Sequence, residues 1–186
     1  MKFKKAFAAV VMSTFMALSL CGLVGCADNS KQVITDSLTE EIESLKNPDD
    51  AMIAEMSSEV PASTFEQLGL NSDDVVRALF EGFDGTVDSV EVDGKNAEAV
   101  VTLSSKDFSQ IEDVMTEVTD ELSNNVEQFS GMSQSEIMAW VGQQLMEKIN
   151  AMPVVTHDPV TIEYVLNGNT WEPTEDAETA VFKALF

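Results

Sequence analysis

The chain has a single histidine, and it stands beside an acid in the run Thr156-His157-Asp158-Pro159. A histidine oriented by a carboxylate can act as a general base, as dehydratases and isomerases require. Adjacent residues on a strand point to opposite faces, however, and Pro159 favours a loop or the entry to a strand. The run therefore favours a surface histidine over a catalytic pair, and we predict no catalytic residue.

Other arrangements of reactive residues are incomplete. Zinc sites need several His or Cys ligands at close spacing, which one histidine does not supply. The segment from Ser89 follows the register of a calcium-binding EF-hand, but its first position is serine and its twelfth is Val100 instead of glutamate. Ser133 and Ser135 have no histidine nearby in the sequence. We therefore predict no metal site and no cofactor, while a hydrolytic pair among the 33 acidic residues stays open.

The N-terminal segment has the layout of an export signal. Lys2, Lys4 and Lys5 precede a run, residues 6–25, that contains no charged side chain. A run of this length could also cross a hydrocarbon core of about 30 Å, so an uncleaved membrane anchor is the alternative. In either case the rest of the chain is expected on the extracytoplasmic side of the cell membrane.

The run Leu23-Val24-Gly25-Cys26 resembles the lipobox of bacterial lipoproteins. The resemblance implies that a signal peptidase recognises the first three residues and cuts before Cys26, whose thiol carries a diacylglyceryl group. Cys21 is the rival candidate, but Leu20 before it is too large for that cleavage pattern. Two acyl chains hold a protein firmly at a membrane, whereas one holds it only marginally. The mature chain would then retain no free thiol and no disulfide.

The charge of the chain limits its partners. Three of the ten basic residues and none of the 33 acidic ones precede Cys26, so the remainder has seven basic and 33 acidic groups, a net charge of −26. Nucleic acid is excluded as a partner, because phosphate binding needs clustered Lys and Arg. An anionic membrane surface would also repel the domain. We therefore expect membrane attachment through the diacylglyceryl group on Cys26 alone.

Apolar residues that recur every three or four positions predict several amphipathic helices. The stripe Ile34, Leu38, Ile42 and Leu45 predicts a first helix that ends at Asn47-Pro48, and Pro48 is expected to open a second. The others are a short turn at 63–68, a helix capped by Asn71, a helix over 107–129 that should be the longest, a helix with the capping box Ser133 and Glu136, and a terminal helix capped by Thr174.

Two β-hairpins are expected among these helices. Residues 87–92 and 97–103 alternate in polarity around Asp93-Gly94, and residues 160–166 alternate before Asn167-Gly168 and Trp171. We predict a single α+β domain, a small antiparallel sheet of two hairpins packed by several amphipathic helices. The expected organisation is a signal peptide at 1–25, a lipidated N-terminus and short stub at 26–31, and one extracytoplasmic domain at 32–186.

The two hairpins resemble those of uncharacterised bacterial lipoproteins whose extracytoplasmic domains have the nuclear transport factor 2-like, or cystatin-like, cone fold. The resemblance rests on the strand and turn Val87-Asp-Ser-Val-Glu-Val-Asp-Gly94 with the strand 97–103, and on the late segment 160–171. It implies a cone-shaped sheet but no catalytic residue. The helical pair predicted between the hairpins departs from that family, in which the sheet would continue.

Three classes of function follow. The first is a tethered module that binds a small apolar ligand or an envelope protein, the second is an envelope assembly or structural lipoprotein without a small ligand, and the third is a hydrolase or isomerase. We favour the first and expect no enzyme. Methionines on the helical stripes are expected in the core, or else in an adaptable pocket whose walls would be Met115, Met138, Tyr164 and Trp171.

Overall fold

Apolar and polar residues alternate along β3 (Asn96–Lys106), the longest described strand, which pairs with three other strands of an antiparallel sheet. The computed structural model describes residues 20–21, 27–59 and 62–185. Along β3 the side chains of Ala97, Ala99, Val101 and Leu103 are buried, and those between them are exposed or half-buried. Since successive side chains of a strand point to opposite faces, the sheet has one covered face and one face in water, as predicted.

The strand order in the described part of the chain is β1-β6-β5-β3-β2, with β4 (Val154–Thr156) paired to the end of β3. Both predicted hairpins are present. β2 (Asp84–Asp93) turns into β3 at Gly94, and β5 (Val160–Asn167) turns into β6 (Thr170–Pro173) at Gly168. These glycines have φ values of 62° and 65°, in the left-handed region that favours glycine.

Two short strands were not predicted. β1 (Leu20–Cys21) pairs with Trp171 and Thr170 at the edge of the sheet, although it lies in the segment expected as a signal peptide. β4 pairs with Ser104, Ser105 and Lys106 of β3 and precedes the loop that contains His157.

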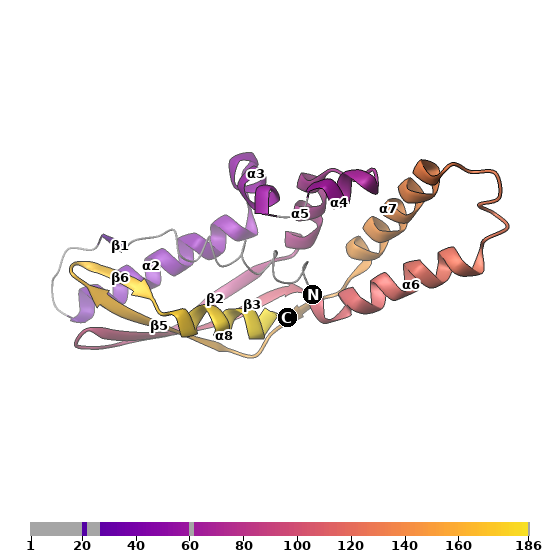
Figure 1. Ribbon diagram of the computed structural model, residues 1–186. Helices are drawn as coiled ribbons and strands as arrows, with labels where there is room; N and C mark the ends of the chain where they lie inside the picture. The colour runs from indigo at the N-terminus through magenta and orange to yellow at the C-terminus, as the bar shows by residue number, and fades with distance from the viewer. Residues whose placement is uncertain (1–19, 22–26, 60–61, 186) are drawn as a thin grey trace.

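Two helices cover the same face of the sheet. α2 (Ala27–Lys46) lies along β2, and α8 (Glu175–Leu185) lies along β5 (Figure 1). The α2 stripe of Ile34, Leu38, Ile42 and Leu45 is almost fully buried, and it joins Val181 and Leu185 of α8 in one core with the covered face. The single α+β domain predicted from the sequence is therefore confirmed.

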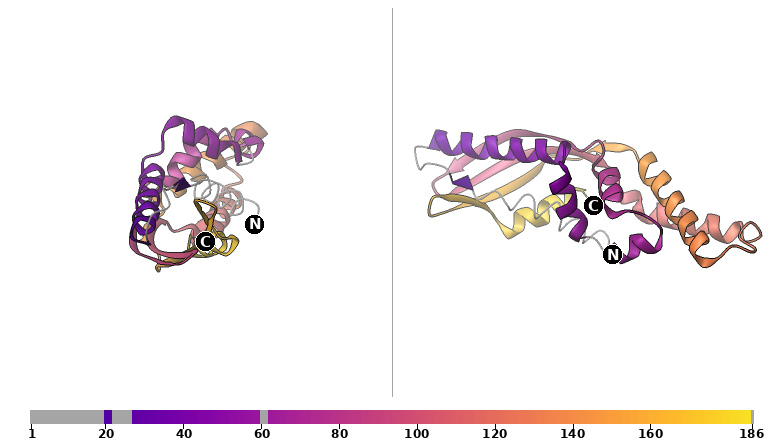
Figure 2. Two further views of the ribbon diagram at one scale, coloured as in Figure 1. Left: turned by 90° about the vertical axis from the view of Figure 1, so that its left-hand side faces the viewer. Right: turned by 90° about the horizontal axis from the view of Figure 1, so that it is seen from above.

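The remaining helices lie toward one end of the sheet, and the last two of them, α6 and α7, project beyond it (Figures 1 and 2). They are α3 (Asp50–Glu59), α4 (Ala62–Gln67), α5 (Ser72–Phe80), the 3₁₀ turn Phe108–Gln110, α6 (Ile111–Asn124) and α7 (Gln134–Ala151). The predicted caps are present: Asn71 accepts from the backbone of Asp73, Ser133 and Glu136 form the capping box, and Thr174 accepts from Ala177.

Two helix predictions were wrong in their extent. The helix expected over 107–129 is only Ile111–Asn124. Before it, Asp107 caps a 3₁₀ turn, and at its end the side-chain amide of Asn125 donates a hydrogen bond to the Glu121 carbonyl. The longest described helix is α2. Pro48 does not open the second helix, because the Asp49 carboxylate accepts from the Met52 backbone and α3 begins at Asp50.

The start of α2 also differs from expectation. The helix begins at Ala27, so residues 27–31, which were expected to belong to a short stub, are helical. The helix therefore starts about two turns ahead of Ile34, the first fully buried residue of the stripe.

Candidate functional site

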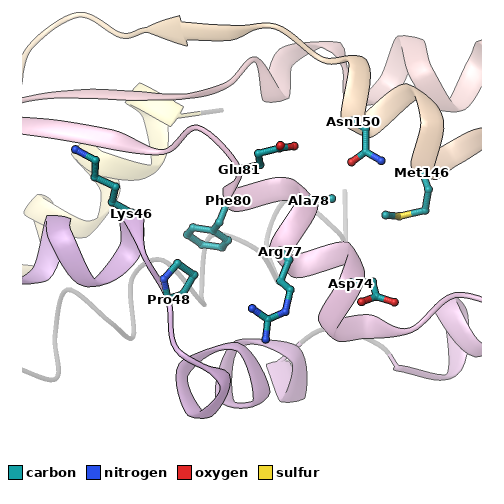
Figure 3. A pocket seen from close by; sticks show the side chains of 9 residues that line it. All are labelled: Lys46, Pro48, Asp74, Arg77, Ala78, Phe80, Glu81, Met146 and Asn150. Atoms are coloured by element: carbon teal, nitrogen blue, oxygen red, sulfur yellow. The ribbon is translucent and has the colours of Figure 1, made fainter.

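A hollow of about 480 Å³ lies where the sheet meets the outlying helices (Figure 3). We call it the junction hollow. It is bounded by the end of α2, by one face of α5 and by the last turns of α7. The residues that line it are Lys46, Pro48, Asp74, Arg77, Ala78, Phe80, Glu81, Met146 and Asn150. It is open to solvent and combines apolar side chains with charged ones.

The charged side chains of the junction hollow are engaged to different degrees. Lys46 pairs with Asp84 at 3.0 Å and with Glu43 at 3.7 Å. Arg77 pairs with Asp50 of α3, whose side chain is 96% exposed. Within the described residues the Asp74 carboxylate has no hydrogen-bond or ion-pair partner. Pairs this exposed to water are weak, so the Arg77 guanidinium can exchange its partner at little cost.

A buried lysine lies behind the junction hollow. The Lys106 side chain is 3% exposed, and its Nζ donates to the Asn150 carbonyl at 3.2 Å and lies 3.5 Å from the Glu81 carboxylate. The Asn150 carbonyl belongs to the last turn of α7, where the helix dipole favours a cation. Lys106 thus ties α5 and α7 to the end of β3.

A serine and the histidine meet next to this lysine. Ser105 Oγ lies 2.8 Å from His157 Nε2 and also donates to the Lys106 carbonyl at 3.0 Å. Partial burial lowers the pKa of His157, against an opposing effect of the Asp107 charge. Ser105 is only 2% exposed, and its proton is held by a backbone carbonyl. The pair therefore stabilises the β3–β4 junction and is poorly placed for nucleophilic attack on a substrate.

The most unusual ionisable group lies under the sheet. Glu41 of α2 is 4% exposed, and its Oε1 has no hydrogen-bond partner. Burial raises the pKa of Glu41 to about 9, so this carboxyl is neutral at pH 7. The pKa of the neighbouring Tyr164 is also raised, first by burial and then by the charge of Glu41.

The four residues predicted as pocket walls lie in two different parts of the molecule. Tyr164 and Trp171 are buried in the core under the sheet. Met115 is 48% exposed on α6, and Met138 is half-buried on α7. None of the four lines the junction hollow or the second surface hollow, which is bordered by residues 57–58, 66 and 69–73. The predicted lipidation and cleavage residues, Leu23, Val24, Gly25 and Cys26, lie outside the described residues.

Sequence reasoning missed Glu41, Lys106 and the Ser105–His157 pair. A signal existed for the first, because Glu41 falls three residues after Leu38 and four before Leu45, inside an apolar helical stripe. Lys106 is the last residue of β3, at a position where the alternation predicts a polar side chain, so the sequence pattern did not single it out. The meeting of Ser105 with His157 depends on the β3–β4 pairing, which was not predicted.

Two negative findings apply to the described residues only. Among them no group of three or more His, Cys, Asp or Glu side chains is placed to hold a metal ion. None of their helices combines the length and apolar character that a membrane crossing requires.

Comparison with known proteins gives one structural similarity. No protein-family model matches the chain, and no curated protein matches it significantly. A solved structure described as a "putative lipoprotein (ycdA)" from Bacillus subtilis is similar over 97% of this chain and 56% of its own, at 15% identity and a TM-score of 0.46. This chain therefore spans a little over half the length of that protein. What the chain does has to follow from its own residues.

Proposed function

We propose that this protein is a lipid-anchored module on the extracytoplasmic face of the cell membrane, which binds another envelope protein. Its lipobox-like run Leu23-Val24-Gly25-Cys26 supports the anchor. The observation that supports binding is the segment 111–151, which consists of helices α6 and α7 and the connection between them, and which we call the arm. The arm projects beyond the rest of the fold at the end away from the start of α2 (Figures 1 and 2).

The arm leaves much of its apolar surface uncovered. Met115, Val126 and Met132 are 48%, 66% and 37% exposed, and they are three of the five exposed large apolar residues in the described part of the chain. Ile137, Met138, Trp140 and Val141 of α7 are only half-buried. Two helices alone cannot bury an apolar stripe on all sides, so this surface suits a third helical layer from a partner.

The charge of the arm indicates which partner fits. α6 has five acidic residues, Glu112, Asp113, Glu117, Asp120 and Glu121, and no basic one. A second copy of the arm would bring the same negative charges together. A cationic amphipathic helix would instead place apolar side chains on Met115 and Val126 and basic ones beside the acidic face. We therefore propose that the partner presents a cationic amphipathic helix.

The position of the arm agrees with a tethered role. α2 begins one residue after Cys26 and has 20 residues, so it is about 30 Å long. It runs along the sheet from the end opposite the arm (Figure 1). A lipid on Cys26 would hold that end at the membrane and leave the arm directed away from the bilayer.

We further propose that the module is not an enzyme. Among the described residues, Ser105 and His157 come closest to a catalytic arrangement, but Ser105 is buried, His157 is half-buried, and the two lie within hydrogen-bond distance of each other at a strand junction. Binding of a small ligand is the second candidate, and the junction hollow is the observation that favours it.

The test is site-specific photo-cross-linking in intact cells. A photoreactive amino acid replaces Met115 or Val126 on the arm, or the control residue Val165, which is 40% exposed on β5. We expect the two arm positions, but not Val165, to cross-link one protein through a basic amphipathic segment mapped by peptide mass spectrometry. Equal cross-linking at all three positions, none at the arm, or cross-links only to a second copy would contradict the proposal.

A further inference from the structure

We infer that the junction hollow binds a small zwitterion with an apolar side chain, of the chemical class of an apolar α-amino acid. The inference does not depend on the membrane anchor or on a protein partner at the arm. It rests on three properties of the hollow: an adjacent pair of opposite charges on α5, an apolar surface beside them, and the strongly negative charge of the whole chain.

The opposite charges are supplied by Asp74 and Arg77. They are three residues apart on α5, so they share a face of the helix, and both line the hollow (Figure 3). Asp74 has no partner within the described residues, and Arg77 holds only the exposed Asp50. Arg77 can take a carboxylate through its planar fork of donors, and Asp74 can accept from an ammonium group.

The apolar surface lies beside these charges. Ala78 follows Arg77 on α5, and Met146 faces α5 from α7 (Figure 3). Phe80 and Pro48 complete the apolar part at the other side. A hollow of about 480 Å³ is within the range of about 300–1,000 Å³ typical of small-molecule sites. An aliphatic side chain of four carbons would contact Met146, which is unbranched and adapts its shape.

The net negative charge of the chain favours a zwitterion over a simple anion as the ligand. The sequence carries a formal net charge of −23, which repels anions as they approach. Glu81 also lines the hollow, so the lining contains two acidic and two basic residues. A ligand without net charge meets no long-range repulsion and can still use both signs of charge locally.

The test compares three ligands with one aliphatic chain by isothermal titration calorimetry on the full-length protein. Norleucine has both charged groups, hexanoate lacks the ammonium, and pentylamine lacks the carboxylate. We expect norleucine to bind at least 10-fold more tightly than either of the others. Equal binding of hexanoate would show an anion site, and no binding of norleucine to the folded protein at millimolar concentration would overturn the proposal.

Variants locate the site. Asp74→Asn and Arg77→Gln should each weaken norleucine at least 10-fold, while Glu98→Gln on the outer sheet face and Lys183→Gln on α8 should leave it unchanged. Asp74→Asn should also abolish the preference for norleucine over hexanoate, a change that a purely structural effect would not cause. If Arg77→Gln fails to fold, Arg77→Lys replaces it and should retain partial binding. Equal weakening by the control variants would overturn the assignment.

Discussion

At the scale of single residues, Glu41 is the clearest conflict between sequence pattern and physical chemistry. The other buried side chains of its helix are apolar except for Ser37, and Glu41 is only 4% exposed with Oε1 unpaired. A charged carboxylate would be very costly there, so the group stays protonated in the folded state. In the unfolded chain the same group would ionise near pH 4.5. Folding is therefore coupled to the uptake of one proton.

This coupling predicts the sign of a pH effect on stability. Between pH 4.5 and about 9 the folded state holds one proton more than the unfolded state at Glu41, so its contribution to stability falls as pH rises. The slope is at most about 1.4 kcal/mol per pH unit. Between pH 5.5 and pH 8.0 the wild type should lose about 3 kcal/mol of stability through Glu41, and the Glu41→Gln variant should not show this loss. Urea unfolding at the two pH values measures the difference. Glu40→Gln, next to it but exposed, is the control, and identical pH dependence in the wild type and Glu41→Gln would contradict the prediction.

A second prediction at this scale concerns Lys106. Its side chain is 3% exposed and satisfies the Asn150 carbonyl and the Glu81 carboxylate. Lys106→Met keeps an unbranched side chain that is one atom shorter but leaves the carbonyl of the α7 terminus without its donor, which should reduce the free energy of unfolding by about 1–3 kcal/mol. Lys183→Met on exposed α8 should change it by less than about 0.5 kcal/mol. Equal effects of the two changes in urea unfolding would show that Lys106 has no special role.

At the scale of elements, α7 of the arm packs closely against the end of α4 at a glycine. Gly142 of α7 is buried, and a Cβ at this position would overlap the backbone carbonyl oxygen of Leu68, at the end of α4. The oxygen belongs to the main chain, so it cannot turn aside as a side chain could. The contact explains why the weakest helix former of α7 lies at its crossing with the 65–70 segment.

Gly142→Ala should therefore destabilise the protein, although alanine is favoured over glycine in a helix by about 1 kcal/mol. The overlap should cost about 1–3 kcal/mol net. Gln143→Ala, an exposed neighbour, is the matched control and should be neutral. Thermal unfolding measures both, and hydrogen exchange should locate the loosening at α4 and α7. A more stable Gly142→Ala variant would rule out the close approach.

The elements that could be predicted from the sequence are those that begin or end at local turn or cap residues. Asp93-Gly94 and Asn167-Gly168 identified both hairpins, and Ser133 with Glu136 identified the start of α7, because turn and cap chemistry is local. The extent of α6 was not predictable from its apolar stripe, since the Asn125 amide ends the helix while Val126 and Phe129 still continue the spacing. The junction hollow depends on how α5, α7 and the end of α2 cross, and no spacing along the chain encodes that crossing.

At the scale of the whole molecule, position and charge act together. The start of α2 and the arm lie at opposite ends of an elongated fold (Figures 1 and 2). A net charge of −26 after residue 25 should repel an anionic bilayer, so in the proposed function the domain is attached through lipid on Cys26 and not through its own surface. Attachment and folding should then be separable, because the core of the domain lies after Cys26 and involves no cysteine after residue 26.

Cys26→Ser tests this separation. We expect the variant to lose the diacylglyceryl mass and to leave the membrane fraction or remain there only as an uncleaved precursor, while the unfolding transition of its domain stays within about 0.5 kcal/mol of the wild type. Cys21→Ser is the matched control and should keep the lipid. Mass spectrometry of the protein released from membranes in mild detergent distinguishes these forms. A diacyl mass retained in Cys26→Ser but lost in Cys21→Ser would transfer the anchor to the other cysteine, and a lipid-free wild type would remove it altogether.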